Sequence, residues 1–138
     1  GRAIDYLETR EDIDADRLGY YGISWGGVMG GVLTAVEPRL KASVLIVGGL
    51  MMQDVQPMAD PFNFLPRVVL PTLMINGRYD SFFPLETSIK PFFDHLGVPE
   101  ADKKLIVTDS NHFVLAYSAN LAIRESLDWM DRYLGPVK

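Results

Sequence analysis

Residues 18–27 read Leu-Gly-Tyr-Tyr-Gly-Ile-Ser-Trp-Gly-Gly, and this stretch is the most informative feature of the chain. It contains a Gly-x-Ser-x-Gly pentapeptide from Gly22 to Gly26, which joins a strand-like run to a run with helical spacing. A sharp strand-to-helix turn would hold Ser24 in a strained backbone conformation, and glycines on both sides would let the two segments pass closely. Because three fixed residues recur by chance in about one chain of this length in twenty, the flanking sequence must decide.

The residues after Ser24 predict a helix that ends at Pro38. Its apolar side chains recur at helical spacing, namely Val28, Met29, Val32, Leu33 and Val36. It also contains four glycines, Gly26, Gly27, Gly30 and Gly31. Each glycine costs a helix up to about 1 kcal/mol relative to alanine, so we expect the helix to pack closely on a sheet in compensation.

Strand-like and helix-like segments alternate along the rest of the chain. The strand-like runs are residues 42–47, 68–76 and 105–108, and the helix-like runs are residues 2–8, 85–96 and 117–134. The last helix carries a predicted apolar stripe of Ile123, Leu127, Met130 and Leu134. Residues 48–70 have no regular period and are interpreted as an excursion above the sheet. The alternation predicts one α/β domain over residues 1–138, with a parallel sheet of about four strands and flanking helices.

Composition excludes several classes of function. The chain has 138 residues and no cysteine, so disulfides and thiolate zinc sites are excluded, and we expect neither a metal nor a cofactor. A net charge of −5 without a basic cluster argues against nucleic acid as a partner. No apolar stretch reaches the roughly 18 residues of a membrane span, and the absence of cysteine suits a reducing compartment. We expect a cytoplasmic protein with no membrane partner.

Two further residues complete a chemical hypothesis for Ser24. A serine hydroxyl near neutral pH needs a base to take its proton and a carboxylate to orient that base. Asp80 follows the predicted strand that ends at Asn76, and His112 follows the strand that ends near Thr108. Because the carboxyl ends of parallel strands meet at one edge of a sheet, both side chains can converge on Ser24.

The chain resembles the C-terminal part of an α/β-hydrolase, in particular the dienelactone hydrolase-like and prolyl-oligopeptidase-like esterases. The resemblance rests on residues 16–27, 71–80 and 110–113 and on the order of serine, aspartate and histidine. It implies ester hydrolysis through an acyl-serine intermediate, with a small ester as substrate. Ser24 would be the nucleophile, His112 the general base and then acid, Asp80 the orienting carboxylate, and the Trp25 backbone N–H an oxyanion donor.

Several alternatives stay open at the level of sequence. Asp54, Asp60 and Asp109 compete for the role of the acid, although Asp109 lies too near His112 to fit the acid position of the family. His95, on a predicted helix, is expected at the surface. The methionines of the irregular segment are either simple loop packing or the lining of a pliable pocket for an acyl or aromatic group, in which Trp25 could take part. These methionines are Met51, Met52 and Met58.

The resemblance also implies that strands and helices precede the serine in the complete fold, including a loop with the second oxyanion donor. Only residues 2–8 form a helix-like segment before it here, so we expect a truncated α/β-hydrolase fold that lacks the N-terminal strands. The strand at residues 18–21 would then have an unpaired edge. The expected partner at that edge is a second copy, giving a homodimer, or the missing N-terminal half. The alternative function is a weak or inactive hydrolase fragment that acts as an oligomerising structural module.

Overall fold

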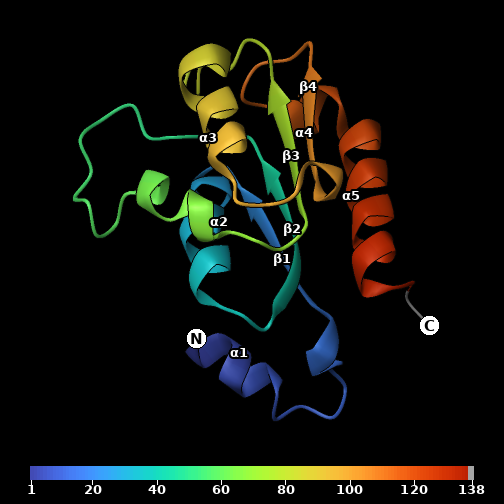
Figure 1. Cartoon of the computed structure of the whole chain (residues 1–138). Helices are drawn as coiled ribbons and strands as arrows, with labels where there is room; N and C mark the ends of the chain where they lie inside the picture. Colours follow the sequence, from blue (N-terminus) through green and yellow to red (C-terminus); the bar gives the residue numbers. More distant parts are fainter. Residues whose placement is uncertain (137–138) are drawn as a thin grey trace.

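The computed structural model describes residues 1–136, which form a four-stranded parallel sheet between two layers of helices (Figure 1). The strands are β1 (Leu18–Ile23), β2 (Leu40–Ile46), β3 (Thr72–Gly77) and β4 (Lys103–Thr108). They lie in the order β1-β2-β3-β4, and each neighbouring pair is parallel. The predicted α/β fold with a parallel sheet of about four strands is confirmed.

The helices cover both faces of the sheet. They are α1 (Arg2–Leu7), α2 (Trp25–Val36), α3 (Lys90–His95), α4 (Val114–Tyr117) and α5 (Ala119–Leu134). Figure 1 shows α2 and α3 on one face and α5 on the other. Leu45 and Met74 point into the core beneath α2 and α3, whereas Val44 and Ile75 point into the core beneath α5. Strands buried on both faces explain the continuous aliphatic runs in the sequence. Within residues 1–136, no helix has the length and hydropathy that crossing a membrane requires.

Prolines set two element boundaries that differ from the predictions. β3 begins at Thr72 and not at residue 68, because Pro71 has no N–H to donate to a neighbouring strand. The helix predicted over residues 85–96 consists of a π-helical turn, Leu85–Ile89, followed by α3. Pro91 lacks the N–H that a continuous helix would use, so a regular α-helix does not run through from residue 85. Residues 48–71 contain only two short 3₁₀ helices, Pro61–Asn63 and Leu65–Arg67.

The stripe predicted for the last helix is wrong in part. Ile123 and Leu127 of α5 are 53% and 59% exposed, and the buried face is instead formed by Ala122, Ser126 and Trp129. The small side chains at 122 and 126 let the helix approach the sheet, and the Ser126 hydroxyl donates to the Ala122 carbonyl at 2.6 Å. The bulky Ile123 and Leu127 side chains therefore remain outside the core.

Three of the four glycines in α2 allow the close packing that the sequence predicts. A Cβ atom at Gly27 would lie 2.9 Å from the Gly48 Cα, and one at Gly30 would lie 2.3 Å from the Leu45 Cδ2. At Gly31 it would lie 2.9 Å from side-chain atoms of both Leu65 and Phe92. At Gly26 the nearest atom would be 3.8 Å away, so the packing around α2 leaves room for a side chain at this position.

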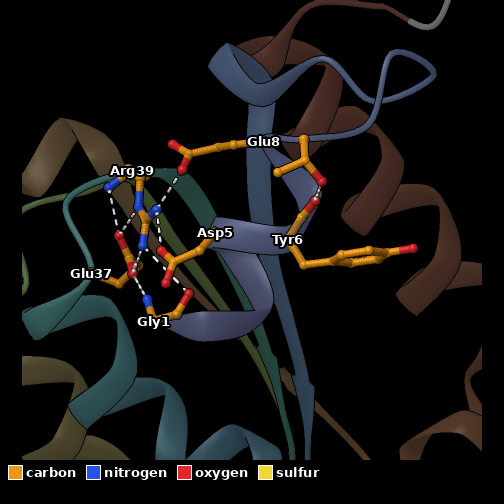
Figure 2. Close-up of polar contacts among 7 residues, drawn as sticks. Gly1, Asp5, Tyr6, Glu8, Glu37 and Arg39 are labelled. Carbon is orange, nitrogen blue, oxygen red and sulfur yellow. Dashed lines mark hydrogen bonds and ion pairs between the residues drawn. The ribbon is translucent and has the colours of Figure 1, made fainter.

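Helix α1 is tied to the connection between α2 and β2 by a cluster of charges around Arg39 (Figure 2). The Arg39 guanidinium donates to Asp5 and Glu8 at 2.7 Å each and to Glu37 at 2.6 Å. The hydrogen bond from Arg39 lowers the pKa of the Asp5 carboxyl. The Gly1 amino group also pairs with Glu37. Asp5 and Glu8 are exposed, and ion pairs near solvent stabilise a fold only weakly, so these two pairs mainly orient α1.

Candidate active site

Ser24 occupies a strained turn between β1 and α2. Its φ of 54° and ψ of −111° lie outside the regions that a non-glycine residue ordinarily adopts. The Ser24 N–H donates to the Ile46 carbonyl of β2 at 2.9 Å, and the Ser24 carbonyl accepts from the Val28 N–H at 3.0 Å. A Cβ at Gly22 would lie 2.3 Å from the Gly26 oxygen, so glycine is required at position 22. Such strain persists only where the surrounding structure holds it, and it is typical of functional sites.

The structure brings Ser24, His112 and Asp80 together at the carboxyl ends of the strands. The Ser24 Oγ lies 2.9 Å from the His112 Nε2, and the His112 Nδ1 lies 2.8 Å from the Asp80 Oδ2. The Asp80 side chain is 0% exposed and that of His112 is 14% exposed. With Asp80 ionised, the Nδ1 carries the proton that donates to the carboxylate, which leaves the Nε2 free to accept from the serine hydroxyl. This chain of hydrogen bonds can move a proton away from the Ser24 Oγ.

The Asp80 carboxylate is held by the backbone of its own loop. Its Oδ1 accepts from the N–H groups of Phe82 at 2.8 Å and Phe83 at 3.0 Å, so both carboxylate oxygens are hydrogen-bonded. The three competing acids have other surroundings: Asp109 pairs with Arg78, Asp60 accepts from the Phe62 N–H, and Asp54 is exposed. Asp80 is therefore the carboxylate that faces His112. The competing histidine, His95, is exposed.

Three phenylalanine rings surround His112, and no pattern in the sequence predicted this arrangement. The ring centroids of Phe82, Phe83 and Phe113 lie 4.8, 5.8 and 6.0 Å from that of His112. These rings shield the imidazole from water, while Phe82 and Phe113 remain exposed at the rim of the site. A less hydrated imidazole keeps its hydrogen bonds to Ser24 and Asp80 without competition from solvent.

Trp25 is the first residue of α2, so its backbone N–H has no acceptor within the helix. The helix dipole adds positive potential at this end. Trp25, Met29 and Met51 border a cavity of about 290 Å³. Met52 and Met58 do not line this cavity, and both are exposed. Of the three methionines proposed for a pocket, the structure thus places Met51 next to Trp25.

A second cavity, of about 490 Å³, opens directly at Ser24 and His112. Its other lining residues are apolar, namely Ile23, Ile46, Val47, Phe113, Leu115 and Ala116. Val47 has a φ of 46°, a rare conformation for a β-branched residue. The Val47 N–H donates to the Ile75 carbonyl at 2.9 Å. The carbonyl of the following residue, Gly48, accepts from the Asn76 side-chain amide at 2.8 Å. A valine after a strand predicts extended backbone, so this bend could not be read from the sequence.

No metal site accompanies these groups in residues 1–136, because no cluster of three or more histidine, aspartate or glutamate side chains is placed to hold an ion.

Residues 3–136 match the family model described as "PETase: PET hydrolase-like". The chain belongs to this family. It is 29% identical over 143 aligned residues to the bis(hydroxyethyl) terephthalate hydrolase of Streptomyces coelicolor, with 96% of this chain and 41% of the relative covered. It is 26% identical over 140 residues to the cutinase est2 of Thermobifida alba, with 96% and 43% covered. The chain thus spans about two-fifths of the length of these two relatives.

Solved structures agree with the fold. A putative dienelactone hydrolase from Klebsiella pneumoniae superposes with a TM-score of 0.80 at 23% identity, covering 95% of this chain and 58% of that one. An α/β-hydrolase from a Penicillium species superposes with a TM-score of 0.83 at 11% identity, covering 98% and 70%. The α/β-hydrolase fold predicted from the motifs is therefore confirmed, and the chain covers part of it.

Proposed function

We propose that this chain is a serine hydrolase that cleaves carboxylic esters through an acyl-serine intermediate. The observation that carries the proposal is the hydrogen-bonded relay from the Ser24 Oγ through His112 to the buried Asp80 carboxylate. The strained backbone at Ser24 supports it, because such a turn presents the hydroxyl at the end of a strand, and strain of this kind is typical of functional sites. Membership of a hydrolase family gives independent support.

In the proposed first step, the Ser24 Oγ attacks the ester carbonyl carbon while the His112 Nε2 takes the hydroxyl proton. The carbonyl electron pair moves onto oxygen, which becomes an oxyanion facing the Trp25 N–H. When the pair returns, the bond to the alkoxy oxygen breaks and that oxygen takes the proton from His112. An alcohol leaves, and the acyl group stays on Ser24.

In the proposed second step, water replaces the alcohol. The His112 Nε2 takes a proton from the water as its oxygen attacks the acyl carbon, and a second oxyanion forms at the Trp25 N–H. Collapse breaks the bond to the Ser24 Oγ, which recovers its proton from His112, and the carboxylic acid leaves. Asp80 keeps its charge throughout and stabilises the imidazolium that forms in both steps.

The cavity at Ser24 and His112 supports an ester with an apolar group as the substrate. Its lining is aliphatic and aromatic apart from the two reacting side chains, so burial of an apolar substituent there is favourable by about 25 cal/mol per Å². The relatives are named as a hydrolase of bis(hydroxyethyl) terephthalate and as cutinases, which fits esters with aromatic or aliphatic parts. We propose small esters of this kind as substrates.

The test combines a covalent probe with turnover. A fluorophosphonate is expected to label the wild-type chain at Ser24, and p-nitrophenyl acetate is expected to be hydrolysed above background. Ser24→Ala should abolish both signals, whereas Ser81→Ala, an exposed serine on the Asp80 loop, should retain both. Equal background rates and no labelling in the wild type and the Ser24→Ala variant would refute the proposal.

The edge of β1 supports a second role, which is association. No charged side chain occurs in Leu18–Ile23, and Tyr21 and Ile23 are 47% and 44% exposed. Unpaired strand edges of this kind are templates for pairing with another strand. We propose that β1 pairs with a strand of a second copy, giving a homodimer, or with a strand from another part of a longer hydrolase domain. If Ser24 proves inactive, this oligomerising role remains as the alternative function.

A further inference from the structure

Tyr20 connects the strand before Ser24 with the helix after it. The Tyr20 hydroxyl, on β1, donates to the Gly26 carbonyl in the first turn of α2 at 2.7 Å. Ser24 lies between the two bonded residues in the chain, so this single hydrogen bond spans the strained turn. The ring of Tyr20 is partly buried, and its burial raises the pKa of the phenol, so the hydroxyl remains a donor at neutral pH and above.

The Tyr20 ring occupies a groove formed by three glycines spaced four residues apart. A Cβ atom at Gly22 would lie 2.8 Å from the Tyr20 Cε1, and a Cβ at Gly30 would lie 3.1 Å from the same atom. A Cβ at Gly26 would just touch the Tyr20 oxygen, at 3.8 Å. The glycines on this face of the turn therefore leave room for a phenol ring, and the hydroxyl reaches the one carbonyl at the centre of the groove.

The bonded carbonyl belongs to the segment that carries the proposed chemistry. Gly26 follows Trp25 directly, and Trp25 follows Ser24, so a shift of this carbonyl moves the proposed oxyanion donor and the nucleophile together. The turn is anchored to the sheet on the other side by the bond from the Ser24 N–H to the Ile46 carbonyl. Removal of either anchor allows the strained backbone to relax.

We propose that Tyr20 is a positioning residue, which holds the first turn of α2 so that the Ser24 Oγ and the Trp25 N–H keep their places relative to His112. This inference rests on the proposed serine hydrolase function. Tyr20 contacts neither the substrate nor the reacting atoms in this scheme, and it acts through the Gly26 carbonyl. Small displacements of positioned groups are costly in catalysis, which makes the effect measurable.

The experiment compares Tyr20→Phe with Tyr6→Phe. The first substitution removes the hydroxyl and keeps the ring in its groove. The second is the control, because Tyr6 is an exposed tyrosine of α1, outside both the Ser24 turn and the edge of β1. With p-nitrophenyl acetate, Tyr20→Phe should lower kcat by about three- to tenfold, the effect of one lost hydrogen bond, and leave KM unchanged. Tyr6→Phe should leave both constants unchanged.

A second readout does not depend on catalysis. Amide hydrogen exchange of residues 22–31 should be faster in Tyr20→Phe than in the wild type, and unchanged in Tyr6→Phe. Urea unfolding of each variant ensures that all measurements are made on folded protein.

The possible results separate the two proposals. Unchanged kcat and unchanged exchange in Tyr20→Phe overturn the inference, and so does a loss of stability with kcat unaltered, because that result indicates a purely structural role. If the wild-type chain shows no Ser24-dependent activity, the proposed function fails, and exchange then decides the positioning claim alone. Faster exchange confined to residues 22–31 supports it, and unchanged exchange overturns it.

Discussion

The two edge strands of the sheet, β1 and β4, differ in how they meet solvent. β4 begins with Lys103 and Lys104, which pair with Glu100 at 3.3 Å and with Glu125 of α5 at 2.7 Å. β1 has no charged side chain and exposes apolar ones. Natural edge strands are commonly blunted by lysine, because a desolvated charge opposes pairing with another strand. β4 therefore has the composition of a true edge, and β1 has the composition of an interior strand.

The candidate active site spans this difference. Asp80 and His112 follow β3 and β4, where the carboxylate is completely buried and hydrogen-bonded through both oxygens. Ser24 follows β1, which is supported by β2 on one side. Two local hydrogen bonds hold the Ser24 turn where a second neighbouring strand is absent from the described sheet. The Ser24 N–H donates to the Ile46 carbonyl, and the Tyr20 hydroxyl donates to the Gly26 carbonyl. The hydrogen bonds from Ser24 through His112 to Asp80 are therefore complete, even though β1, the strand before Ser24, has a neighbouring strand on one side only.

The largest effect on catalysis is expected for a substitution at Asp80, on the side of the site that follows β3 and β4. Asp80→Asn should lower kcat by about 10⁴-fold, because an amide no longer holds His112 in the tautomer that accepts the serine proton. Asp109→Asn is the control, since Asp109 is exposed and pairs with Arg78. Steady-state ester hydrolysis measures both variants. An Asp80→Asn enzyme with most of its activity would show that this side does not orient the base.

A smaller effect, on the free energy of unfolding, is expected for a substitution in α2 where this helix packs against the end of β2. Gly27→Ala should lower the free energy of unfolding by about 1–3 kcal/mol, because the added methyl group would lie 2.9 Å from the Gly48 Cα. Gly26→Ala is the matched control and should raise it by up to about 1 kcal/mol, since the position is open and alanine favours helix. Urea denaturation gives both values. Equal changes in the two variants would contradict the packing described for this helix.

The proposed pairing of two copies through the edge of β1 is tested by introducing a charged side chain there. If two copies pair there, Tyr21→Lys should weaken the homodimer by about tenfold or more, because like charges meet across the two-fold axis. Light scattering should then report the mass of one 15.4 kDa chain at concentrations where the wild type is a dimer. Tyr79→Lys, an exposed tyrosine on the loop after β3, should leave the dimer intact. A wild type that is monomeric at all concentrations would remove the homodimer proposal.

The smallest effect on stability is expected beside β4, where Lys104 pairs with Glu125 of α5. Hydrogen bonds from Lys104 and Arg124 lower the pKa of Glu125 in the folded state. Its contribution to stability is therefore present above the unfolded value of 4.5 and is lost as the pH falls through the lower folded value. Glu125→Gln should cost less than about 1 kcal/mol at pH 7 and nothing in strong acid, as measured by urea unfolding across pH. The control is Glu11→Gln, at an exposed glutamate, which should cost less stability at pH 7 than Glu125→Gln.

Periodicity predicted the alternation of strands and helices correctly, because the spacing of apolar residues reflects which faces are buried. It failed for α5, where Ala122 and Ser126 are buried and the larger Ile123 and Leu127 are exposed. Hydrophobicity alone predicts that the bulky side chains are buried. The close approach of α5 to the sheet leaves room only for the small ones. Proximity in sequence likewise grouped Met58 with Met51, although the fold places them in different surroundings.

Local sequence patterns were enough to predict the Ser24 turn, the order of the three candidate catalytic residues and the parallel sheet, because backbone constraints and apolar periodicity are local properties. The tertiary structure alone decided which carboxylate faces His112, how Val47 bends into the cavity, and why Tyr20 meets Gly26. Ser24 and His112 are 88 positions apart, and His112 and Asp80 are 32 apart. Contacts between residues so distant in the chain depend on strand order and packing, which no local pattern encodes.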